Sequence, residues 1–118
     1  MISEIVSSMN FNKNILFAYL FGSHSKNEQT TNSDVDIAIY LADYSLDIEL
    51  QINYELSKIL KKNVDIVILN RVRNIFLLEN ILKEGIVLKD SSERIDFELS
   101  KQHEILDYKA FRRYIDAA

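Results

Sequence analysis

The sequence of 118 residues contains no cysteine, no proline and no tryptophan, and only two glycines. The absence of cysteine excludes both a disulfide framework and a thiolate zinc site. No apolar run approaches the roughly 18 residues that a membrane-spanning helix requires. The first residues also lack the basic region and apolar stretch of a secretory signal. These absences predict a protein that does not associate with membranes and is located in the cytoplasm.

Positive charge is also scarce and scattered. The formal net charge is −4, and the basic residues occur in ones and twos, without a long basic run. Proteins that bind long nucleic acids usually carry a basic stripe that neutralises phosphates. The charge pattern therefore disfavours a DNA or RNA substrate and favours a nucleotide or a protein partner. With 47% hydrophobic residues, the chain is expected to form one domain over 1–118.

Apolar periodicity predicts an α/β chain of the α+β type, with a small mixed sheet of about four strands and helices mainly on one face. Helices are expected over 2–10, 46–60, 72–84 and 92–115, with a short helix between Gly22 and about residue 28. Strands are expected over 14–21, 34–41, 63–69 and 86–88, and a loop over 28–33.

Two of the expected helices need comment. Residues 46–60 alternate like a strand, but 15 residues without a turn exceed usual strand lengths, and Ser45 is a suitable N-cap, which favours a helix. The helix over 92–115 is expected to be available for contact with a partner. Its packing residues are predicted to be Ile95, Leu99, Leu106, Phe111 and Ile115.

The most informative pattern joins a glycine turn to a pair of acids. Gly22-Ser23 follows an apolar strand, and after ten residues Asp34-Val35-Asp36 opens a second apolar strand. Side chains at i and i+2 of a strand share a face, which places the two acids about 6.6 Å apart. Two carboxylates at that distance repel by about 2–3 kcal/mol. A cation relieves such repulsion, and all-oxygen ligands suit Mg²⁺ or Mn²⁺.

A third acid lies within another apolar strand. Asp65 is surrounded by Val64, Ile66 and Val67, and burying an isolated carboxylate there would be costly unless it were paired or bound to a metal. If this strand lies beside the Asp34/Asp36 strand, the three acids converge. Three acids around two metal ions is an arrangement used for in-line phosphoryl or nucleotidyl transfer.

These residues are where the sequence resembles a known family. Gly-Ser, ten residues, Asp-x-Asp and a later strand Asp resemble the nucleotidyltransferases of the polymerase β superfamily. The size of the chain resembles the minimal nucleotidyltransferases, specifically the MntA-type antitoxins of HEPN/MNT toxin–antitoxin pairs. The resemblance covers nearly the whole chain and implies a polymerase β-like nucleotidyltransferase fold.

The resemblance also implies an activity, a site and a partner. The activity is that of a protein adenylyltransferase that uses ATP and two Mg²⁺ ions, with Mn²⁺ as a possible substitute. It moves AMP to a tyrosine hydroxyl of a cognate HEPN-domain RNase toxin, with which it would form a hetero-oligomer. The metal ligands and catalytic residues would be Asp34, Asp36 and Asp65. The nucleotide-binding residues would be Gly22, Ser23, Lys26 and Ser33.

The segment after Gly22-Ser23 departs from the pattern of the family. Lys26 stands where Arg is usual, which keeps the charge but loses the bidentate fork, and Asn27 replaces a glycine. This departure leaves open a catalytically weak antitoxin that neutralises its toxin by binding alone. A third interpretation is a nucleotidyltransferase that modifies a small hydroxyl compound such as an aminoglycoside. Such enzymes usually carry an additional domain, which a chain of this length lacks.

Overall fold

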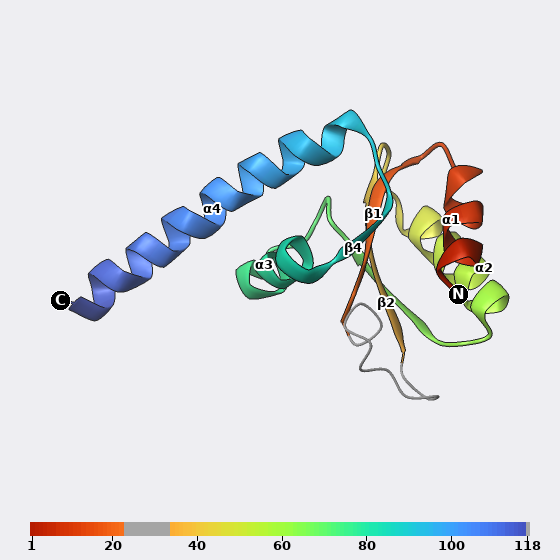
Figure 1. The fold of residues 1–118 in the computed structure, drawn as a ribbon, viewed down its shortest axis with the longest axis horizontal. Coiled ribbons are helices and arrows are strands. Elements are labelled where there is room, and N and C mark those ends of the chain that lie inside the picture. The colour runs from red at the N-terminus through yellow and green to blue at the C-terminus, as the bar shows by residue number, and fades with distance from the viewer. Residues whose placement is uncertain (23–33, 118) are drawn as a thin grey trace.

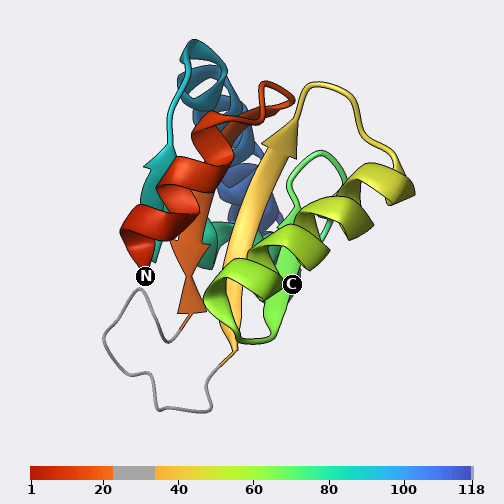
Figure 2. The same ribbon diagram turned by 90° about the vertical axis from the view of Figure 1, so that its right-hand side faces the viewer.

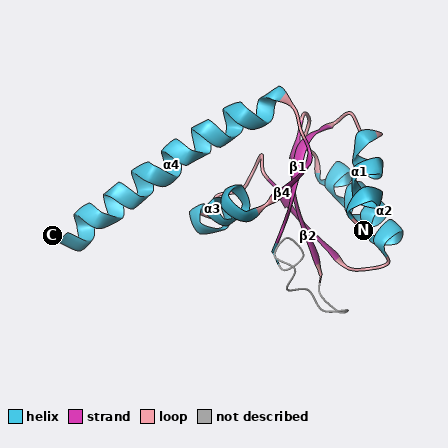
Figure 3. Ribbon diagram, in the orientation of Figure 1, coloured by secondary structure: helices cyan, strands magenta, loops and turns pink. Residues whose placement is uncertain are grey.

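The computed structural model of the chain describes residues 1–22 and 34–117. The short helix and the loop expected between Gly22 and residue 33 lie outside this part. Figure 3 shows the helices and strands. In chain order they are α1 (Ile2–Asn10), β1 (Ile15–Phe21), β2 (Val35–Leu41), α2 (Leu46–Leu60), β3 (Val64–Ile68), α3 (Ile75–Glu84), β4 (Ile86–Lys89) and α4 (Ser92–Ala117).

The four strands form one mixed sheet in the order β3-β2-β1-β4. Strand β1 runs antiparallel to both β2 and β4, whereas β2 and β3 are parallel. The parallel pair is connected by α2, which returns the chain along the sheet (Figure 2). The predicted fold class, an α+β chain with a four-stranded mixed sheet, is confirmed. Within the described residues, no helix is both long and apolar enough to cross a membrane.

The helices lie on both faces of the sheet, not mainly on one as predicted from the sequence. Helices α1 and α2 cover one face, and α3 and α4 lie on the other (Figure 1). The reason is visible in the strands, whose burial does not alternate. Six of the seven residues of β1 and five of the seven of β2 are buried, so both faces of the central strands must be covered.

The two faces carry separate hydrophobic cores. On the α1/α2 side, Ile5 and Met9 of α1 and Ile52 and Leu56 of α2 pack on alternate strand residues such as Ile37. On the other side, Phe17 and Tyr19 of β1 meet Leu78 and Ile81 of α3 and Ile105 of α4. The sheet is therefore held firmly between two layers, and its end near Gly22 is positioned by both cores.

The helix ends follow local capping chemistry. The Ser45 hydroxyl accepts from the Ile48 N–H at 3.1 Å, which confirms the predicted N-cap of α2. Helix α3 begins at Ile75 instead of residue 72, because the Asn74 side chain accepts from the N–H groups of Phe76 and Leu77. Side-chain capping by Asn74 thus sets the start of α3 three residues later than apolar periodicity predicts.

Gly85 ends α3 as predicted, but not in the left-handed conformation common for glycine at that position. Its φ is −68° and its backbone is extended. A Cβ at this position would clash with the Ile81 carbonyl oxygen and lie 3.2 Å from the Tyr19 Cβ. Glycine is needed here for the close approach to β1.

Helix α4 has the predicted extent but not the predicted packing face. Ile95, Leu99, Leu106, Phe111 and Ile115 are all 49–62% exposed. The helix instead packs through Ile105, which is buried, and through the half-buried Phe97. The packing face also includes Arg94 and Glu98, whose polar character hides it from a search for apolar periodicity.

Candidate active site

Four of the predicted site residues lie at one end of the sheet. Gly22 follows the last residue of β1, Asp34 and Asp36 flank the first residue of β2, and Asp65 lies at the start of β3. Because β1 runs antiparallel to β2 while β3 runs parallel to it, all four positions fall at the same end of the strands. The hydrogen bonding between β2 and β3 extends to this end of the sheet, since the Val35 N–H donates to the Asn63 carbonyl at 3.0 Å.

Asp36 and Asp65 are direct neighbours across two strands. In the parallel pairing of β2 and β3, Asp36 is the register partner of Asp65. Paired residues on neighbouring strands project to the same face, here the face that also carries Ala38 and Val67. Asp36 is half-buried, whereas Asp34 and Asp65 are exposed. The expectation that the strand of Asp65 lies beside the Asp34/Asp36 strand is confirmed.

Gly22 completes this cluster from the third strand. It continues β1 next to Phe21, which pairs with Asp36 in the antiparallel ladder. Its φ is +74°, and a Cβ at this position would clash with the Asp36 Oδ2 and lie 3.2 Å from its Cγ. Glycine is thus required twice, for the left-handed backbone and for the space that the carboxylate occupies.

The chemistry of these side chains fits a hard divalent cation. Carboxylate oxygens are the ligands that Mg²⁺ and Mn²⁺ prefer. Within residues 1–22 and 34–117, no three His, Cys, Asp or Glu side chains are arranged closely enough to form a metal cluster. Strand register thus places Gly22, Asp36 and Asp65 next to one another, but Asp34, Asp36 and Asp65 do not converge on one point as predicted. Ser23, Lys26 and Ser33 lie outside the described residues.

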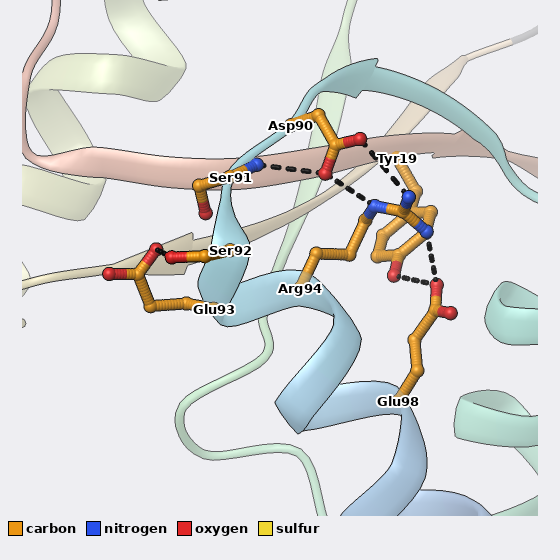
Figure 4. A network of polar contacts seen from close by, with 7 residues as sticks. All are labelled: Tyr19, Asp90, Ser91, Ser92, Glu93, Arg94 and Glu98. Atoms are coloured by element: carbon orange, nitrogen blue, oxygen red, sulfur yellow. Dashed lines mark hydrogen bonds and ion pairs between the residues drawn. The ribbon is translucent and has the colours of Figure 1, made fainter.

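A polar network behind the site was not predicted from the sequence. The Tyr19 hydroxyl of β1 donates to the Glu98 Oε1 of α4 at 2.5 Å. Arg94 donates to the same oxygen at 3.0 Å and, through two nitrogens, to the carboxylate of Asp90 at 2.6 and 3.1 Å (Figure 4). This network fixes α4 to the strand that carries Gly22. Its sequence signal is the spacing of Asp90, Arg94 and Glu98 at i, i+4 and i+8.

The network shifts the pKa values of Tyr19 and Asp90, two of its members. Burial, reinforced by the neighbouring Glu98 carboxylate, raises the pKa of the Tyr19 phenol above its ordinary value of 10.0. Hydrogen bonding from Arg94 lowers the pKa of Asp90. Tyr19 is therefore a neutral donor at physiological pH. These side chains orient α4 and do not belong to the acid cluster.

Comparison with known proteins gives this geometry a family. Residues 3–94 match the family described as polymerase beta, nucleotidyltransferase. A protein of Methanocaldococcus jannaschii, provisionally named as a protein adenylyltransferase, is 34% identical over 70 residues, which are 58% of this chain and 74% of that protein. A second such protein of the same organism is equally similar over 71% of its length.

Solved structures extend the similarity to α4. A chain in a crystal structure of a toxin–antitoxin with AMP-PNP superposes with a TM-score of 0.82 at 25% identity, covering 98% of this chain and 95% of that chain. A structure of a tri-AMPylated Shewanella oneidensis HEPN toxin in complex with an MNT antitoxin gives a TM-score of 0.72 at 21% identity, covering 99% and 97%. The second likeness concerns the fold alone.

The matched region runs from α1 to the first turn of α4 and contains Gly22, Asp36 and Asp65. Because the family model spans most of the chain and the acids occupy adjacent strands at one sheet edge, this protein belongs to the polymerase beta nucleotidyltransferase family and is a nucleotidyltransferase.

Proposed function

We propose that this protein is a Mg²⁺-dependent antitoxin that transfers AMP from ATP to a tyrosine hydroxyl of a cognate HEPN-family RNase toxin, releases pyrophosphate and so neutralises the toxin. The observation that carries the proposal is the register pairing of Asp36 with Asp65 next to the left-handed Gly22. The similarity to a toxin–antitoxin structure with AMP-PNP supports ATP as the nucleotide. The AMPylated HEPN toxin in the Shewanella oneidensis complex supports the class of acceptor.

The proposed role of the acids is to hold metal ions and position the acceptor. Asp34, Asp36 and Asp65 would ligate two Mg²⁺ ions, which supply charge neutralisation and activation of the attacking oxygen when bound. Asp65 is exposed on the edge strand β3, so an acceptor can approach it from solvent. Its carboxylate would orient the acceptor tyrosine and accept the proton that the hydroxyl loses.

The phosphates of ATP would be held on the other side of Asp36. The backbone around Gly22, whose left-handed φ suits glycine, would hold these phosphates. Ser23, Lys26 and Ser33, which follow in the same segment, would donate hydrogen bonds to phosphate oxygens. The site would then act through positioning and charge neutralisation, as phosphoryl transfer generally does.

The whole chain would serve as one catalytic domain over 1–118, with residues 92–115 of α4 used in contact with the toxin. We propose that the two proteins form a hetero-oligomer in the cytoplasm. This use of α4 is supported by its exposed apolar residues, such as Leu106 and Phe111. Such side chains are normally covered when they form a continuous patch.

One sequence observation favours a second candidate function. Lys26-Asn27 replaces the Arg-Gly that is usual in the family, which suits an antitoxin that binds its toxin without modifying it. The two functions are distinguished in cells by an Asp34→Ala/Asp36→Ala variant. If the protein acts as a transferase, the variant no longer protects cells against the toxin. If it acts by binding alone, the variant still protects them.

The direct experiment incubates the HEPN protein encoded beside this one with wild-type antitoxin, ATP and Mg²⁺, followed by intact mass spectrometry. The proposal predicts a gain of one or more adenylyl units and, after digestion, their location on a tyrosine. An unchanged mass together with a stable complex of the two proteins would contradict it in favour of the binding antitoxin.

A further inference from the structure

A groove follows the seam between α3 and α4. It consists of two adjoining hollows, with cavity volumes of about 500 and 300 Å³, which share Leu106 and Lys109 in their walls. The larger hollow is bounded by Phe76 at the start of α3 and by the last turns of α4. A seam between two packed helices is a shape that accepts a third helix.

The floor of this groove is apolar and uncovered. Phe76 is 64% exposed and Leu106 is 62% exposed. The Phe76 ring meets the Tyr108 ring edge to face at 5.8 Å between centroids, which holds both aromatic side chains in place. A floor of ordered apolar side chains offers a binding surface at small conformational cost.

The rim of the groove is basic on an acidic protein. Four cations, Lys83, Lys109, Arg112 and Arg113, line the two hollows, against the acids Glu79 and Asp116. Lys109 forms an ion pair with Glu79 across the seam, whereas the chain as a whole carries a net charge of −4. The local excess of positive charge selects for an acidic occupant.

The groove lies between the two helices that cover the sheet face from which Asp36 projects. Ala38, the strand neighbour of Asp36 on that face, belongs to the core beneath α3 and α4. The last turns of α4 extend away from the sheet (Figure 1), and a helix end without tertiary packing is only marginally stable. A partner seated here would both stabilise this end and lie on the catalytic side.

We infer that the α3–α4 groove docks an acidic amphipathic helix of the protein that receives the nucleotide. The inference rests on the proposed function for the existence of a protein acceptor, and adds where and by which chemistry that acceptor binds. Apolar side chains of the docked helix would cover Phe76 and Leu106. Its carboxylates would pair with Arg112 and Arg113 at the rim.

The test measures binding of the neighbouring HEPN protein to antitoxin variants by isothermal titration calorimetry. Arg112→Glu/Arg113→Glu reverses the charge of the rim, and Leu106→Asp places a charge on the apolar floor. The matched controls, Lys13→Glu/Lys58→Glu and Leu50→Asp, change exposed residues of the same kinds on the opposite side of the sheet. We expect the groove variants to weaken binding by roughly tenfold or more and the controls by less than about twofold.

A second measurement uses only the wild-type proteins, so it does not depend on the folding of a variant. Hydrogen exchange of the complex should show protection in residues 76–83 and 102–116 and none in α2. Protection of α2 instead, or equal binding by the groove variants and their controls, would overturn the inference.

Nucleotide transfer distinguishes failure of this inference from failure of the proposed function. If wild type transfers AMP and the groove variants transfer it equally well, the docking site is wrong and the enzyme assignment remains. If wild type binds through the groove but transfers nothing, the docking site remains and the proposed activity is wrong. Specific binding of RNA to the groove in place of the HEPN protein would also overturn the docking inference.

Discussion

Asp36 on β2 and Asp65 on β3 are register partners in the parallel part of the sheet, and Gly22, directly after β1, lies against the carboxylate of Asp36. Residues from three segments far apart in the sequence thus meet at one end of the sheet. This relationship connects two acids that lie 29 positions apart in the sequence, and it depends on the crossover helix α2. The predictions below test what this arrangement and its supporting contacts do.

Replacing Gly22 by alanine should damage both stability and activity. The left-handed φ of +74° costs a residue with a Cβ about 1–2 kcal/mol, and the new methyl group would displace the Asp36 carboxylate. Chemical denaturation and AMP transfer measure the two effects. Gly85→Ala is the matched control, because its φ is negative and its clashes are with Ile81 and Tyr19. Gly85→Ala should lower stability but leave transfer per folded molecule unchanged, and equal loss of transfer in both variants would contradict the prediction.

Divalent metal should stabilise the protein through the paired acids. At about ten times its dissociation constant, bound Mg²⁺ adds about 1.4 kcal/mol of stability, which raises Tm by roughly 6 °C for a domain of this size. In an Asp36→Asn/Asp65→Asn variant this gain should vanish, while the metal-free Tm stays equal or rises because repulsion is relieved. Differential scanning fluorimetry with EDTA, Mg²⁺ and Mn²⁺ measures this. A wild-type gain retained in full by the variant would place the metal elsewhere.

Removal of the Tyr19 hydroxyl should loosen α4. Tyr19→Phe loses the hydrogen bond to Glu98 and is expected to cost about 1–2 kcal/mol in free energy of unfolding. Tyr54→Phe, a change of the same kind on the exposed surface of α2, should cost almost nothing. Urea unfolding compares the two variants. Equal stability of both would show that the hydrogen bond makes no net contribution to the free energy of unfolding.

The same bond predicts a dependence on alkaline pH. The pKa of Tyr19 is raised above 10.0 in the folded protein, mainly by burial, so the folded state retains the phenol proton longer than the unfolded chain does. The contribution of Tyr19 is therefore complete below about pH 10 and is lost as pH rises further. The stability difference between wild type and Tyr19→Phe should therefore hold below about pH 10 and shrink over the range above it. A difference that stays constant over this range would contradict the shift.

Much of the fold and the acid cluster could be predicted from the sequence because their signals are local. The apolar strands, the Ser45 cap of α2 and the Gly22-to-Asp36 spacing each depend on residues close in the chain. Their adjacency to Asp65 was only a condition at the level of sequence, and the parallel pairing of β2 with β3 establishes it.

The placement of α3 and α4 could not be predicted in the same way. The packing face of α4 includes Arg94 and Glu98, which are held by Tyr19 from a strand 79 positions before Glu98. The apolar residues Ile95 and Leu99, which periodicity favours, are exposed instead. A long-range polar network thus determines which face of α4 packs on the sheet, against the local apolar pattern.

The central claim is that Asp34, Asp36 and Asp65 at one end of the sheet catalyse AMP transfer to a protein. The most direct measurement is the transfer of labelled AMP from ATP to the neighbouring HEPN protein by wild type, Asp36→Asn and Asp43→Asn. Asp43 is an exposed acid beyond the opposite end of β2, so it controls for the loss of one negative charge. The account predicts a loss of at least about a hundredfold for Asp36→Asn and near wild-type transfer for Asp43→Asn. Wild-type transfer by Asp36→Asn would contradict it.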